Sequence, residues 1–259
     1  MIIDTHCHLD DERFKDDLDE VIKRAKEHDV KGFIIPGADP DDLERAKEIS
    51  EKYDEVFFAA GVHPYEIDKF DKDYLLKFLD HPKCVAVGEC GLDYYRLPKE
   101  QKEKEKIKKR QKEIFIEHIK IAKEVNKPLI VHIREASFDS REILIENGAK
   151  EVGGVLHCFN ASEILLDLDK HNFYFGIGGV ITFKNAKKLV NILPKIPINK
   201  ILIETDSPYL TPHPYRGKRN EPYYTIFIAK KIAEILNMDF DEVCNITTEN
   251  AKRLFKCFL

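Results

Sequence analysis

The sequence has no apolar run that approaches the roughly 20 residues needed to cross a bilayer. Its first residues also lack the pattern of a secretory leader, in which a basic stretch precedes an apolar one. These two absences exclude a membrane-spanning helix and a signal peptide of the usual kind. We therefore expect a cytoplasmic protein with no membrane partner.

An excess of positive charge is also absent, because the formal net charge is -5 and the pI is near 6.1. Without a global basic field, contact with nucleic acid requires a local basic patch. Segment 99–112 is crowded with Lys and Glu, and one interpretation is an arm that binds nucleic acid. Its mixed signs, and an apolar period that continues through Ile114, Ile119 and Ala122, favour a long amphipathic helix instead.

Cysteine pairs of the Cys-X-X-Cys type are missing, although the chain has six cysteines. A chain of 259 residues needs no disulfide staples, so we expect reduced thiols. Cys7, Cys90 and Cys158 each stand beside a candidate metal ligand, which raises the hypothesis of thiolate ligands. Each is one position away from that ligand, however, and strand alternation favours a thiol that points the other way.

The sequence does have a regular alternation of apolar runs with segments of helical periodicity. Strands that are apolar on both faces are typical of a parallel sheet, and eight such units predict a closed (β/α)8 TIM barrel of the α/β class. Two additional C-terminal helices are expected at 223–236 and 239–255. The eight predicted strands are 1–3, 32–37, 56–62, 84–88, 128–131, 153–156, 173–177 and 200–205.

Linkers, low-complexity tracts and internal repeats are not found along the chain. Its 43% hydrophobic and 34% charged residues are ordinary for a globular protein, and α/β barrels of about 200–250 residues form around one core. We therefore expect one domain, covering 1–259.

Histidines and acidic residues follow several of the predicted strands. The first strand leads into His6 and His8, and alternation along a strand sends both imidazoles to the same side. In a closed parallel barrel the C-terminal ends of all strands meet at one face. Singly, each histidine is explained as a rim hydrogen bond and each acid as a helix cap. Jointly, they predict a metal site made of His6, His8, Glu89, His132, His157 and Asp206.

Imidazoles and carboxylates, with no convergent thiolate, suit Zn, Mn or Mg. Six ligands are too many for one catalytic metal that keeps a position open for water, so two divalent cations sharing a carboxylate fit better. Such a pair activates a bridging water and stabilises the attacking and leaving oxygens of a phosphoryl displacement. Asp206 and Glu89 are the candidate catalytic residues. Our hypothesis for Asp206 is that it ligates one metal and accepts the proton of the attacking water.

Longer motifs resemble those of the TatD-type metal-dependent deoxyribonucleases, a family of the amidohydrolase-like superfamily. They span nearly the whole chain: HCHLD at 6–10, GVHP at 61–64, GECGLDYY at 88–95, VHIR at 131–134, HCF at 157–159, ETDSPYL at 204–210 and RGKRNEP at 216–222. The resemblance implies a TIM-barrel hydrolase with Glu89 bridging two metals. It implies one metal held by His6, His8, Glu89 and Asp206, and the other by Glu89, His132 and His157.

Position 90 departs from this family, which often has threonine where this chain has Cys90. A small residue beside the bridging carboxylate is expected to tune its surroundings and to replace no ligand. Asp93, in the same motif, is expected to orient a loop or a ligand histidine.

Candidate substrate-binding residues surround the predicted rim. His63 is either a donor to a substrate phosphate or a rim hydrogen bond, and both interpretations stay open. Arg134 lies two residues past His132, where it faces the same mouth and pairs with a phosphate or forms a structural salt bridge. The segment after the last strand often binds phosphate in barrels. From this segment we expect cations and stacking faces for a single strand from Tyr209, Arg216, Lys218 and Arg219.

Several functions follow from one predicted site. The resemblance implies a phosphodiesterase acting on DNA, which trims the 3′ ends of single strands. An ester or aminoacyl-nucleic-acid hydrolase is the nearest alternative, because the same activated water attacks an acyl carbonyl. C–N amidohydrolases are less favoured, since such barrels bridge their metals with a modified lysine where this chain has Glu89, and Lys83 lies at the wrong end of that strand. Six intact ligand positions disfavour a binding module without chemistry.

Overall fold

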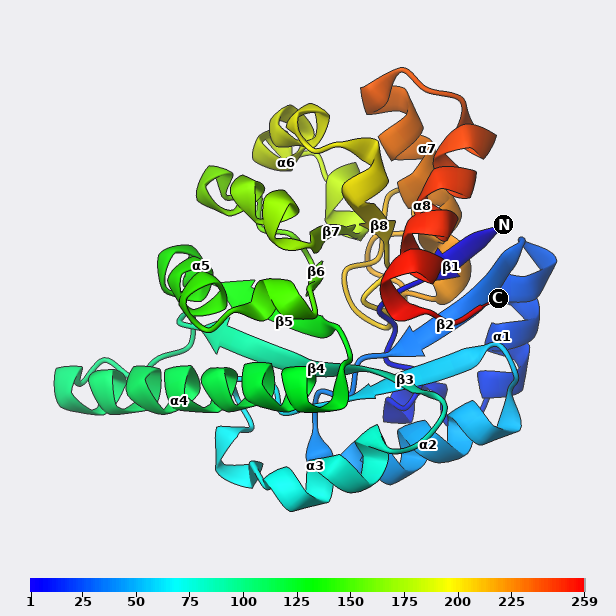
Figure 1. Ribbon diagram of the computed structural model, residues 1–259. Coiled ribbons are helices and arrows are strands. Elements are labelled where there is room, and N and C mark those ends of the chain that lie inside the picture. Colours follow the sequence, from blue (N-terminus) through cyan, green and yellow to red (C-terminus); the bar gives the residue numbers. More distant parts are fainter. Residues whose placement is uncertain (259) are drawn as a thin grey trace.

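Eight parallel strands with helices between them form the computed structural model, which describes residues 1–258 (Figure 1). The strands pair in chain order, each with the next, which confirms the predicted (β/α)8 architecture. Within residues 1–258 we find no helix whose length and apolar character would let it span a membrane. The strands are β1 Ile2–Asp4, β2 Val30–Ile35, β3 Val56–Ala60, β4 Cys84–Asp93, β5 Leu129–Arg134, β6 Gly154–Leu156, β7 Phe173–Ile177 and β8 Ile201–Ile203.

Helices surround the strands, and 3-10 turns fill several connections. The helix after β4 is the long α4 at the lower left of Figure 1, which confirms that the Lys- and Glu-rich segment is helical. It begins where the side chain of Glu100 accepts from the amides of the first turn, and it ends at Asn126 in the left-handed region. The helices are α1 Leu18–Glu27, α2 Leu43–Lys52, α3 Lys72–Leu79, α4 Gln101–Val125, α5 Ser137–Glu146, α6 Lys187–Ile192, α7 Thr225–Leu236 and α8 Phe240–Phe255.

The barrel interior is filled by alternate side chains from every strand. These side chains form one apolar cluster: Ile3, Ile34, Ala59, Ala86, Ile130, Val155, Tyr174 and Leu202. Leu254 and Phe255 of α8 belong to the same cluster. Asn250 of α8 also donates to the Ile201 carbonyl, at the N-terminal end of β8. Helix α8 therefore closes the end of the barrel opposite the C-terminal ends of the strands.

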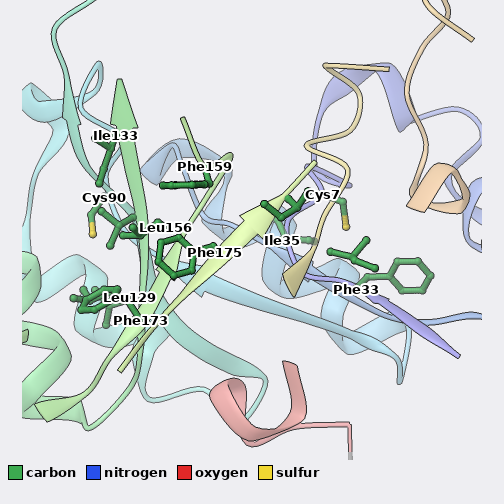
Figure 2. Close-up of a cluster of buried hydrophobic side chains, with 14 of the residues drawn as sticks. Cys7, Phe33, Ile35, Cys90, Leu129, Ile133, Leu156, Phe159, Phe173 and Phe175 are labelled. Carbon is green, nitrogen blue, oxygen red and sulfur yellow. The ribbon is translucent and has the colours of Figure 1, made fainter. Parts of the chain in front are cut away.

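A larger apolar layer lies between the strands and the helices that cover them. Figure 2 shows part of it: Phe173 and Phe175, two positions apart on β7, lie beside Leu129 of β5 and Leu156 of β6. Because successive strand residues point to opposite faces, each strand contributes to both the interior and this outer layer. This arrangement explains why the strands read as continuous apolar runs.

Backbone hydrogen bonds close the barrel between its first and last strands. The Asp206 amide donates to the His6 carbonyl at 2.9 Å, and the His8 amide donates to the Ser207 carbonyl at 2.8 Å. The segments that complete the barrel are thus the same segments that carry three of the predicted metal ligands. Closure of the barrel therefore brings these three side chains to the same part of the rim.

One local difference from the expected elements concerns the site. Strand β4 was expected to end at 88, but it continues to Asp93 and pairs with β5 from Cys90 to Asp93. A side chain at Gly91 would place its Cβ 2.1 Å from the His132 carbonyl oxygen, so only glycine permits this close pairing. Glu89 and His132 therefore lie inside strands. After β6, segment Glu163–His171 is a 3-10 helix.

Candidate metal centre

His6, His8 and Asp206 form the first group of candidate ligands. The Nε2 atom of His8 lies 3.4 Å from Oδ1 of Asp206, and Nε2 of His6 lies 3.7 Å from the same oxygen. Asp206 lies three residues after the end of β8 and has a φ of 57°, a left-handed conformation that aspartate tolerates better than most residues. His6 is fully buried, while His8 is partly open to solvent.

Glu89 lies at the centre of the remaining ligands. One carboxylate oxygen, Oε2, is 3.4 Å from Nε2 of His6. The other, Oε1, is 2.9 Å from Nδ1 of His132 and 3.9 Å from Nε2 of His157. The structure therefore brings all six residues of the predicted metal site to one place at the barrel rim, with the glutamate between three imidazoles.

Possible metal-binding groups overlap in this cluster. One group is His6, His8 and Asp206, and a second is His6, Glu89 and His157. The family resemblance implies that His157 and His132 bind the same metal. In the structure, the ring of His157 instead stacks on that of His6, with centroids 3.4 Å apart. A third group contains residues outside the predicted ligand set, namely His63 and Asp93, together with His132.

The buried nitrogen atoms show that a cation fits this centre. Neither ring nitrogen of His6 has a hydrogen-bond partner, although both are buried. A buried polar atom without a partner costs about 1–3 kcal/mol, and a coordinated cation removes that cost. The donor set of imidazole nitrogens and carboxylate oxygens suits a borderline or hard divalent ion. The residues therefore fit at least one divalent metal.

The charges of the centre also favour a cation. Burial acts to raise the pKa of Glu89, but His157, His132 and His6 hold that pKa well below its usual range. Asp206 is only partly exposed, and although burial acts to raise its pKa, its hydrogen bond with His8 and the nearby His157 and His6 lower that pKa. Both carboxylates are therefore ionised at neutral pH. Burial opposes protonation of His157, yet Glu204 and Glu89 raise its pKa to about 10, and the same negative potential favours a bound metal.

Glu204 is a neighbour of the centre that the sequence analysis did not single out. It is 1% exposed, its Oε1 lies 3.0 Å from Nδ1 of His157, and the same oxygen accepts from the Cys158 amide at 2.6 Å. A carboxylate beside the second ring nitrogen of a ligand histidine fixes the orientation and tautomer of the ring. The local signal for Glu204 is its place two residues before Asp206, directly after the apolar run of β8.

His132 has an equivalent neighbour in Asp93. The Nε2 atom of His132 lies 3.0 Å from Oδ2 of Asp93, while Nδ1 faces Glu89. This contact agrees with the expectation that Asp93 orients a ligand histidine.

Two cysteines and one lysine that the sequence analysis considered contact the protein backbone. All six cysteines are free, as expected, and the thiols of Cys7 and Cys90 contact the backbone carbonyls of Ile34 and Ile130. The Nζ atom of Lys83 donates to carbonyl oxygens at the end of α2, including that of Tyr53 at 2.8 Å. It therefore lies at the N-terminal end of β4, away from Glu89.

A cavity of about 610 Å³ opens beside the ligands. We call it the rim cavity, and its lining includes His132, His157 and Asp206. Among the predicted substrate-binding residues, Arg134 and Tyr209 also line it. His63 is not among the lining residues, but its Nε2 lies 3.7 Å from Oε1 of Glu89, the oxygen that also faces His132. Burial lowers the pKa of His63 to about 4 and keeps its imidazole neutral.

The basic residues after β8 are placed differently, outside the lining of the rim cavity in the described part of the chain. The guanidinium of Arg219 donates to both carboxylate oxygens of Asp17 and to Glu221. Arg216 donates to the Thr211 carbonyl at 2.8 Å. The Nζ atom of Lys218 lies 5.5 Å from the centre of the Tyr215 ring. A contact of these three cations with substrate stays a prediction.

Comparisons with known proteins agree with this geometry. Residues 3–256 match the family model described as TatD related DNase. The chain is 47% identical, over 99% of both chains, to the uncharacterized metal-dependent hydrolase YabD of Bacillus subtilis. It is 32% identical, over 98% of both chains, to a protein of Shigella flexneri named 3'-5' ssDNA/RNA exonuclease TatD. The crystal structure of the TatD homologue YJJV from Escherichia coli K12 matches with a TM-score of 0.89 at 28% identity, covering 99% of this chain and 98% of that chain.

Proposed function

The chain belongs to the TatD related DNase family of metal-dependent hydrolases, and on this premise we propose that it releases nucleotides from the 3′ ends of single-stranded DNA. It is an enzyme that hydrolyses ester bonds, and the bond we assign is the phosphodiester. The Shigella relative is named as a 3'-5' exonuclease on single-stranded DNA and RNA, which supports the choice of a single strand and of its 3′ end.

The observation that carries the proposal is the position of Glu89. Its two oxygens face imidazoles on opposite sides, His6 on one and His132 on the other. This arrangement supports two divalent cations with the carboxylate between them, and Zn, Mn and Mg are the candidates. Bound metals of this kind lower the pKa of water and neutralise charge that develops on a phosphate.

The side chains of the centre divide the remaining work. We assign His6, His8, His132 and His157 to metal binding together with both carboxylates. Asp206 is ionised and partly open to the rim cavity, so it can accept the proton of the attacking water. Arg134 is exposed at the mouth and is assigned to a substrate phosphate, because guanidinium pairs with phosphate through two parallel hydrogen bonds. Neutral His63 is assigned as a further donor.

The shape of the rim cavity favours a chain end. Beside the ligands it has an apolar wall that includes Phe159, Val180 and Leu189, against which a base can pack. Tyr209, at the same mouth, has an exposed ring that can stack on a base. A cavity of about 610 Å³ accommodates a ligand of small-molecule size, so an end nucleotide enters it more readily than a duplex.

The test measures nucleotide release from single-stranded DNA labelled at either end, with EDTA and with added Mg, Mn or Zn. We expect release from the 3′ end that is lost with EDTA and restored by at least one metal. RNA of the same sequence, acyl esters and amides are run beside it. Faster turnover of an acyl ester than of DNA would favour the ester-hydrolase alternative, and no metal-dependent turnover of any substrate would contradict a hydrolase.

A further inference from the structure

Exposed tyrosines gather near the candidate metal centre. Six large hydrophobic side chains of the described chain are exposed, and three of them are tyrosines of this region. Each of these tyrosines has an arginine over its ring. The distances from guanidinium carbon to ring centre are 4.3 Å for Arg13 on Tyr209, 3.7 Å for Arg134 on Tyr95, and 5.4 Å for Arg96 on Tyr65. The pairs with Arg134 and Arg96 present a flat face and a cation together, which suits both parts of a nucleotide, whereas Arg13 donates to both carboxylate oxygens of Asp11.

A second cavity lies next to the rim cavity, and the two share one lining residue, Arg96. Its volume is about 370 Å³, and it lies between the segment around Tyr65 and the first half of α4. Arg96 lines both cavities. We call the second cavity the α4 groove. Six of its lining residues matter for binding: Tyr65, Arg96, Leu97, Lys106, Ile107 and Arg110.

The α4 groove combines apolar surface with positive charge. Leu97 and Ile107 offer apolar faces, while Arg96, Lys106 and Arg110 supply three cations. Two carboxylates, of Asp68 and Glu103, also line it, so the cations are in excess although the whole chain carries a net charge of -5.

The two cationic side chains of α4 that line the groove, Lys106 and Arg110, form no strong ion pair within the described chain. Arg110 has its Nη1 atom 3.6 Å from Oε2 of Glu113, a long and exposed contact. Lys106 forms no ion pair with any residue of the described chain. Both side chains are therefore available to a phosphate.

We propose that the α4 groove binds the part of a single nucleic-acid strand that follows the end nucleotide held in the rim cavity. This inference rests on the proposed function, since it extends the path of the same substrate. Phosphates of the strand contact Arg96, Lys106 and Arg110, and bases pack on Tyr65, Leu97 and Ile107. The groove thereby gives the enzyme a preference for a strand of several nucleotides over a short phosphodiester.

The test compares Lys106→Ala and Arg110→Ala with the matched control Lys109→Ala. Lys109 is exposed on the same helix, carries the same charge and is not among the residues that line the groove. Each variant is assayed on a 12-nucleotide single strand and on bis(4-nitrophenyl) phosphate, which is too small to reach the groove. Thermal melting checks that each variant is folded.

On the 12-mer, we expect KM to rise about 3- to 10-fold for each groove variant with kcat nearly unchanged, because each substitution removes one cation that faces a phosphate. The slope of log(kcat/KM) against log[salt] should fall by about 0.7 for each phosphate that is no longer neutralised. The effect should be confined to the 12-mer, and Lys109→Ala should match the wild type. Groove variants that behave like Lys109→Ala on the 12-mer would contradict strand binding in the α4 groove while leaving the proposed function intact. A wild type that hydrolyses neither substrate would instead remove the proposed function.

Discussion

Glu89 and Asp206 differ in how far they are exposed, and this difference is the reason we propose different roles for them. Glu89 is 3% exposed and enclosed by imidazoles, which fits its proposed role as a metal ligand. Asp206 has a side chain that is 15% exposed and lines the rim cavity. Of these two residues, Asp206 alone combines an ionised carboxylate with access for water, which supports its proposed role as the general base.

Replacing Asp206 with asparagine keeps the size of the side chain and one oxygen for a metal, but removes the group that accepts a proton. We expect Asp206→Asn to melt close to the wild type while nucleotide release falls about 100- to 10,000-fold. The measurement is kcat on the labelled single strand at saturating metal. A variant that retains full turnover would remove Asp206 from the base role.

Glu204 makes a different prediction, because it contacts a ligand histidine and lies behind it. Glu204→Gln keeps an oxygen for the Cys158 amide but removes the charge that holds His157. We expect metal affinity to fall about 10- to 100-fold. Titration calorimetry with Zn or Mn on the wild type and the variant measures this change without an activity assay. Equal affinities would show that Glu204 only accepts the hydrogen bond of the Cys158 amide and does not influence metal binding.

At the scale of the elements, the sequence predicts where strands begin better than where they end. His132 and Glu89 were expected to follow strands, but β4 and β5 continue past them because Gly91 allows their backbones to pair closely. The ligand positions were still predictable, since each interrupts an apolar run. Glu204 was not, because its role depends on which face of β8 is inward, and that face is set by barrel closure.

Helix α4 contains a second kind of buried histidine. His118 is fully buried, its Nε2 accepts from the Val62 amide at 3.0 Å, and its Nδ1 lies 2.8 Å from the Ile114 carbonyl. It joins the middle of α4 to the loop after β3, and it takes no part in the metal centre. Burial lowers its pKa to about 4, so the folded protein holds this imidazole neutral.

This burial predicts a stability change with pH. The unfolded chain binds a proton to His118 near its ordinary pKa of 6.5, whereas the folded protein binds it only near 4. The stabilising contribution is therefore complete above pH 6.5 and is lost as the pH falls toward 4. Between pH 8 and pH 5, urea unfolding of the wild type should lose about 2 kcal/mol more than unfolding of His118→Gln. Equal losses in the two proteins would contradict a neutral buried His118.

At the scale of the whole molecule, two different closures hold the barrel. Helix α8 closes the N-terminal end with apolar side chains, and the C-terminal end contains the ligand cluster. The sequence predicted a helix at 239–255, and the structure confirms it with α8 at Phe240–Phe255. Its place under the barrel could not be predicted, because nothing local to the helix indicates which surface it covers.

The apolar closure makes a stability prediction. Phe255 is 3% exposed within the interior cluster, so Phe255→Ala should lower the free energy of unfolding by about 3–5 kcal/mol. Phe138→Ala is the matched control, since Phe138 is 67% exposed and its loss should change stability by less than about 0.5 kcal/mol. Both values come from urea unfolding at pH 8. Similar values for the two variants would show that α8 does not seal the barrel.

The ligand cluster at the C-terminal end of the barrel predicts which part of the molecule a bound metal stabilises. His6 and His8 belong to the first strand segment and Asp206 to the last, so a cation that they share ties together the two ends of the sheet. Metal at a hundredfold excess over its Kd should stabilise the protein by about 2.7 kcal/mol per site, and EDTA should lower the Tm accordingly. Hydrogen exchange on EDTA treatment should rise most at the amides that join these segments, including those of His8 and Asp206. Exchange at the Phe173 and Phe175 amides of β7 serves as the internal reference, because that strand carries no ligand. An equal rise in both regions would mean that metal is bound without joining the first strand to the last.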